Sequence, residues 1–67
     1  MEIINDNGLN IAKGEKFVVL KVEEEKYIQS GYEFIDGLLV KGYTLLSMVP
    51  FITLGKHYGF LAHLTKT

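Results

Sequence analysis

The chain has 67 residues with a formal net charge of −1, and 48% of its residues are hydrophobic. This length allows one domain, residues 1–67, and the hydrophobic fraction argues against disorder. The core of so short a chain is small, and the absence of cysteine excludes disulfides and thiolate metal sites. Close packing or association with another chain must therefore stabilise it.

Two turn signals interrupt an alternating pattern in the first 22 residues. Asn7-Gly8 predicts a two-residue hairpin, because both central positions of a type I′ turn need a positive φ, and it pairs Ile4 with Ile11. Gly14-Glu15 predicts a second hairpin of type II′, in which Ile11 lies opposite Val18. The two turns together indicate a three-stranded antiparallel meander.

Both turns place the same apolar side chains on one face of this meander. That face holds Ile4, Leu9, Ile11, Val18, Leu20 and Val22. Phe17 and Val19 fall on the opposite face, which indicates that the third strand is covered on both sides. We expect Ile4, Ile11, Val18 and Leu20 to be buried together.

The alternation stops at residues 23–31. Consecutive glutamates at Glu23–Glu25 favour the N-terminus of a helix through the helix dipole, and Gly31 suits the residue just after a helix. One short helix or helical turn fits this stretch. A continued strand that ends in an acidic loop is the alternative.

Residues 32–49 allow two interpretations. The first is a hairpin that turns at Asp36-Gly37, and the second is a helix, because apolar residues recur at near-helical spacing from Phe34 to Val49. Gly37 and Gly42 would each cost a helix about 1 kcal/mol relative to Ala. Several residues from 40 to 49 also prefer strands, so we favour the strand interpretation.

The last third of the chain predicts further strands. Pro50 indicates an edge strand or a bulge, because proline cannot donate a hydrogen bond within a sheet. A final strand over residues 58–64 places Phe60, Ala62 and Leu64 on one face. The expected fold is mostly β: a small antiparallel barrel or sandwich of five to seven short strands that begins with a meander and has at most one short helix.

Charge is distributed unevenly along the chain. Residues 1–36 carry all eight carboxylates and four lysines, whereas residues 37–67 carry three lysines and no carboxylate. Such a distribution influences how a partner approaches a small domain. The candidate acidic interaction patch consists of Glu23, Glu24, Glu25, Glu33 and Asp36.

No catalytic or metal-binding motif is present in the sequence. His57 and His63 lack the further ligands that a metal site needs, and neither Ser30 nor Ser47 lies in a nucleophile turn. The glycines are scattered and form no phosphate-binding loop. We therefore expect no catalytic residue, no metal and no cofactor.

Nucleic acid and membrane are improbable partners. The chain contains no arginine and its isoelectric point is near 6.0, although its tyrosines and phenylalanines could stack on bases. The stretch between Lys41 and Lys56 is too short to span a bilayer, which needs about 20 residues. We expect a cytoplasmic protein.

The sequence favours a noncatalytic protein-interaction module, a small regulator or inhibitor of a larger protein whose identity the sequence does not give. A small β-barrel that binds nucleic acid is the alternative. The apolar second half also predicts a homodimer formed between residues 38 and 64, since aromatic residues and methionine are enriched at interface centres. The expected anchors are Tyr43, Met48, Phe51 and Phe60.

Overall fold

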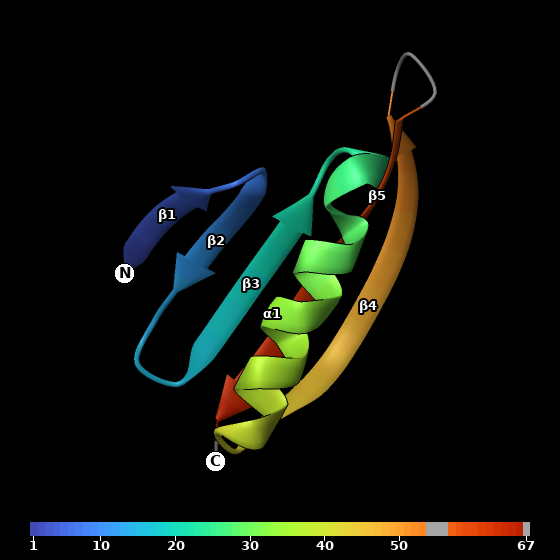
Figure 1. Cartoon of the computed structure of the whole chain (residues 1–67). Helices are drawn as coiled ribbons and strands as arrows, with labels where there is room; N and C mark the ends of the chain where they lie inside the picture. Colours follow the sequence, from blue (N-terminus) through green and yellow to red (C-terminus); the bar gives the residue numbers. More distant parts are fainter. Residues whose placement is uncertain (54–56, 67) are drawn as a thin grey trace.

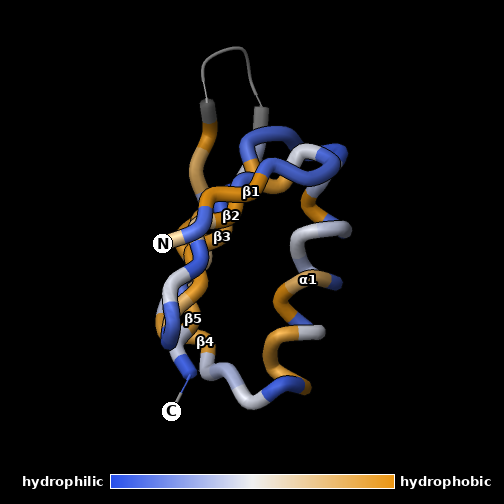
Figure 2. Tube along the Cα trace, turned by 90° about the vertical axis from the view of Figure 1, so that its left-hand side faces the viewer, coloured by the Kyte–Doolittle hydropathy of each residue, from blue (hydrophilic) through white to orange (hydrophobic). Residues whose placement is uncertain are grey.

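The computed structural model describes residues 1–53 and 57–66, which form one antiparallel sheet and one helical segment (Figure 1). The elements are β1 (Glu2–Asp6), β2 (Leu9–Lys13), β3 (Phe17–Val22), the 3-10 turn η1 (Glu25–Tyr27), α1 (Ile28–Val40), β4 (Tyr43–Thr53) and β5 (His57–Lys66). The strand order is β1-β2-β3-β5-β4, so β5 lies between β3 and β4. Figure 2 shows the sheet edge-on with α1 on one side of it.

The expected mostly β fold that begins with a strand meander is confirmed, and η1 and α1 form the single short helical segment. The sheet is open, with β1 and β4 as its edges, and does not close into a barrel. No second sheet is needed among the described residues because α1 covers the apolar side chains of the central strands.

The first hairpin has the predicted turn and the predicted register. Asn7 and Gly8 both adopt positive φ angles, 48° and 80°, as a type I′ turn requires. Ile4 pairs with Ile11, and Asp6 pairs with Leu9.

The second hairpin differs from the prediction by two residues in its pairing. Ile11 lies opposite Leu20 rather than Val18, because the turn is centred on Glu15-Lys16 instead of Gly14-Glu15. Gly14 has no positive φ, and its N–H donates to the Phe17 carbonyl at 2.9 Å. The Phe17 ring lies over Gly14 where a larger residue would have its Cβ. A shift of two leaves every side chain on its expected face.

The strand interpretation of residues 32–40 is wrong, because this stretch is the greater part of α1. Gly31, Ile35 and Leu38 recur at intervals of three and four, and all three are buried against the sheet. The hairpin at Asp36-Gly37 does not form. Packing of Ile35 and Leu38 on the core outweighs the cost of Gly37 within the helix.

Gly31 allows α1 to lie close to the sheet, and Gly42 ends the helix. Gly31 lies inside α1 rather than after it, and a Cβ there would come within 2.8 Å of both Phe60 and Val22. Gly42, with a φ of 99°, follows the helix, and its N–H donates to the Leu39 carbonyl at 3.1 Å. Gly42 is therefore the residue that ends α1 in the left-handed conformation.

The predicted strands of the last third are confirmed. β4 contains Pro50 and is an edge strand, and β5 includes the predicted segment 58–64. Phe60, Ala62 and Leu64 are buried in the core as expected. The complete core cluster is Leu9, Ile11, Val18, Leu20, Val22, Ile35, Leu38, Tyr43, Phe60, Ala62 and Leu64, with Ile4 half-buried beside it.

Replacing Leu20 by Ala should lower the free energy of unfolding by about 2–5 kcal/mol, because the side chain is fully buried and its loss leaves a cavity. Urea unfolding followed by circular dichroism measures this. Leu39→Ala is the matched control: Leu39 is 44% exposed on α1, so its loss should cost less than about 1 kcal/mol. A cost below about 0.5 kcal/mol for Leu20→Ala would show that the core is wrongly assigned.

Substitution by alanine at the two interior glycines of α1 should change the free energy of unfolding in opposite directions. Gly37→Ala should raise the free energy of unfolding by about 0.5–1 kcal/mol, because nothing lies within 4 Å of the added Cβ and Ala favours helix. Gly31→Ala should lower it by about 1–3 kcal/mol, because Phe60 and Val22 are buried and must move. Thermal unfolding of both variants tests this, and stabilisation by Gly31→Ala would contradict the close approach.

Candidate functional site

The sheet face that points away from α1 is rich in apolar side chains. Successive strand residues point to opposite faces, so the neighbours in sequence of the buried residues lie on this side. We call this surface the bare face. Its apolar members are Ile3, Ala12, Phe17, Val19, Val49, Phe51 and Leu61.

Several of these side chains are unusually open to solvent. Ile3 is 66% exposed, Val49 55% and Leu61 41%, and the other members are half-buried among their neighbours. Val49, Phe51 and Leu61 also line a shallow hollow of about 490 Å³ together with Lys21 and Glu23. The bare face is thus a broad apolar surface with one depression near β4 and β5.

The pairing of the strands arranges the bare face in rows across the sheet. Val49 lies opposite Leu61, which lies opposite Lys21 on β3. In the next row, His63 lies opposite Val19, which is followed by Ala12 and Ile3. In this second row β3, β2 and β1 contribute apolar side chains, whereas Val49, Phe51 and Leu61 form a second apolar group on β4 and β5.

The bare face has little net charge. Lys21 forms an exposed ion pair with Glu23, with 3.5 Å between Nζ and Oε1. The His63 ring meets the Phe17 ring edge-on, with ring centres 6.4 Å apart. Among the described strand residues, no carboxylate lies on this face, and its uncharged polar members include Asn10, Ser47 and Thr65.

The five residues of the predicted acidic patch occupy two separate elements. Glu23, Glu24 and Glu25 lie between β3 and α1, whereas Glu33 and Asp36 are exposed on α1. Glu24 approaches Lys26 at 3.7 Å, and Glu23 pairs with Lys21. The neighbouring lysines therefore offset part of the negative charge at the start of the helical segment.

The four predicted dimer anchors do not form one exposed surface. Tyr43 and Phe60 are buried in the core, and Met48 packs against it from β4. Phe51 is half-buried and belongs to the bare face. Sequence reasoning missed Val49, Leu61 and Ile3 as surface candidates. The apolar residues Phe17 and Val19 on the outer face of the third strand were the signal that pointed to them.

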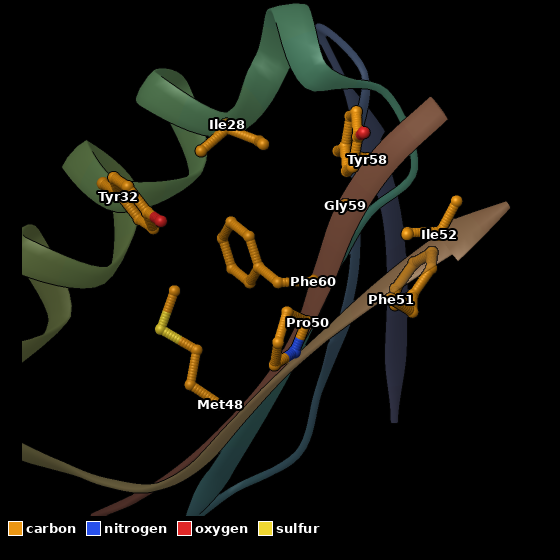
Figure 3. Close-up of a pocket in the computed structure, with 9 residues that line it drawn as sticks. All are labelled: Ile28, Tyr32, Met48, Pro50, Phe51, Ile52, Tyr58, Gly59 and Phe60. Carbon is orange, nitrogen blue, oxygen red and sulfur yellow. The ribbon is translucent and has the colours of Figure 1, made fainter. Parts of the chain in front are cut away.

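A second apolar hollow, of about 570 Å³, lies where α1 meets the far end of β4 and β5 (Figure 3). Ile28 and Tyr32 of α1 line one side, and Pro50 and Tyr58 lie on the strands. Tyr32 stacks on Phe60, with ring centres 5.3 Å apart and planes 23° apart. No carboxylate, histidine or lysine is among the described residues that line this hollow.

Catalytic and metal-binding groups do not assemble in the described part of the chain. Within residues 1–52 and 58–66, no three of the His, Asp and Glu side chains come together as metal ligands. His63 is exposed on β5, as expected for the last strand. No described helix has the length and hydropathy needed to cross a membrane.

Comparison with known proteins adds no functional assignment. No family model matches the chain, and no curated protein and no solved structure is significantly similar to it. Inference about its function therefore rests on the residues of the bare face and the two hollows.

Zinc should not stabilise the protein, because the sequence offers the two histidines no further ligands of the usual kind. Thermal unfolding with and without equimolar zinc tests this in the wild type and in the His57→Gln, His63→Gln double variant. A zinc-dependent rise in Tm that the double variant loses would demonstrate a metal site.

Proposed function

We propose that the chain is a noncatalytic protein-interaction module that binds through its bare face. The observation that carries this proposal is the group of exposed apolar side chains on the bare face, including Ile3, Val49 and Leu61, on the side of the sheet opposite α1. Large exposed apolar surfaces on small domains are usually binding sites, because contact with a partner removes them from water. A small regulator or inhibitor of a larger protein is the role that such a module fits.

The chemistry of both hollows supports a noncatalytic role. The hollow beside α1 is lined by apolar and aromatic side chains, with only tyrosine hydroxyls as polar side-chain groups. The hollow on the bare face contains one lysine and one glutamate, which pair with each other. Neither of these sites combines a nucleophile with a base, which acid–base or nucleophilic catalysis needs.

Nucleic-acid binding, the alternative, has weaker support. Phosphate recognition needs several free cations on one surface. On the described strands of the bare face, Lys21 is the only lysine, and it is paired with Glu23. Phe17 and Phe51 could stack on bases, but without surrounding positive charge their surface favours a protein over a polyanion.

Site-specific photo-crosslinking in the native cell tests the proposed function. Leu61→benzoylphenylalanine places the crosslinker on the bare face, and Leu39→benzoylphenylalanine places it on α1. The two leucines have nearly equal exposure, 41% and 44%, so they are matched in accessibility. We expect protein adducts, either with another protein or with a second copy, from position 61 and not from position 39. Absence of any adduct at position 61 would contradict the proposal.

A further inference from the structure

We infer that the bare face is covered by the bare face of a second copy of the chain, so that two sheets pack face to face with α1 of each copy on the outside. This inference rests on the proposed function, because it names a second copy as the protein that the bare face binds. Regulation of a larger protein would then use a surface outside the bare face. It also relocates self-association from buried residues such as Phe60 to exposed ones such as Val49 and Leu61.

The size of the bare face matches a two-copy interface. A strand residue occupies about 3.4 Å along the strand and about 4.8 Å across the sheet. The five strands, of 5 to 11 residues each, therefore have a planar area of roughly 600 Å², and protruding side chains add to this. A standard interface buries about 800 Å² on each partner. One copy of this sheet therefore supplies nearly the area that another copy needs.

The low net charge of the bare face allows the bare faces of two copies to contact each other. A surface with a single sign of charge would repel its own copy, whereas the Lys21–Glu23 pair leaves this face nearly neutral. The carboxylates Glu33 and Asp36 lie on α1, on the opposite side of the sheet. Two copies can therefore bring their bare faces together while these carboxylates stay in water.

The sheet edges are less suited to association than the bare face. Pro50 lies in the middle of edge strand β4 and has no N–H to offer a neighbouring strand. The other edge, β1, is only five residues long and carries exposed Glu2 and Asp6 at its ends. Extension of the sheet across an edge is thus disfavoured relative to face-to-face packing.

Packing of two antiparallel sheets explains the pattern of side chains on this face. In such sandwiches, the strands of the two sheets cross at about −30° and the inner side chains interdigitate in a layer about 10 Å thick. Apolar side chains from all five strands, including Ile3, Val19 and Leu61, are available for this layer. With a two-fold axis that lies between the two bare faces and parallel to them, both copies would contribute the same residues to the interface.

Sedimentation equilibrium of the purified chain over a hundredfold concentration range tests the inference. The wild type should approach twice its 7.6 kDa mass at the upper concentrations. Leu61→Lys should weaken association by at least about a hundredfold, because each copy places an uncompensated charge in the interface. Leu39→Lys, the matched control on α1, should leave the dissociation constant within about threefold of wild type.

A second variant and a folding check keep the result interpretable. Val49→Lys changes a residue that is 55% exposed, and it should weaken association as Leu61→Lys does while both variants keep the circular dichroism spectrum of the wild type. A wild type that stays at 7.6 kDa throughout, or folded variants at both positions that dimerise like wild type, would overturn the inference.

The crosslinking experiment separates this failure from failure of the proposed function. A monomeric wild type whose position 61 forms adducts with a different protein overturns the second copy as the occupant and leaves the interaction module standing. A monomeric wild type with no adduct at position 61 overturns both. Adducts of twice the chain mass from position 61, together with the loss of dimer in Leu61→Lys, support both.

Discussion

The close approach of α1 to the sheet at Gly31 determines where the rest of the core can lie. With no side chain at this position, the helix backbone lies directly against Phe60 of β5 and Val22 of β3. The next helical turns then bring Ile35 and Leu38 into the same layer. Because one helix can cover only one face of a five-stranded sheet, the same contact that completes the core leaves the opposite face without cover.

Local turn chemistry predicted much of the fold, and packing determined the rest. The Asn7-Gly8 hairpin and the buried set on β5 follow from residues that are close in sequence. Most of α1 could not be predicted in this way, because Gly31 suits the residue after a helix and Gly37 disfavours the interior of one. Only the structure shows that the first is required by a neighbouring strand and that the second faces open space. The pairing of β2 with β3 was also not predicted, because the sequence does not show that the Phe17 ring packs over Gly14.

The candidate site was less predictable than the fold. A five-residue acidic group was visible in the sequence, but the structure divides it between the start of the helical segment and the surface of α1. Aromatic residues were equally ambiguous, because aromatic character suits both cores and interfaces, and Phe60 belongs to the core. The bare face depends instead on aliphatic residues from distant strands, such as Ile3 and Leu61, which only the sheet order brings onto one surface.

The position of β5 between β3 and β4 has a consequence for how the chain folds. β5 follows all other strands in sequence, yet β3 and β4 both pair with it and not with each other. During synthesis, β4 has no strand to join and the apolar side of α1 has only part of its support until β5 emerges. The β1-β2-β3 meander can form early, but the core closes in one late step that depends on contacts distant in sequence. Such contacts slow folding, because closing a long loop loses conformational entropy before the packing contacts form that compensate for it.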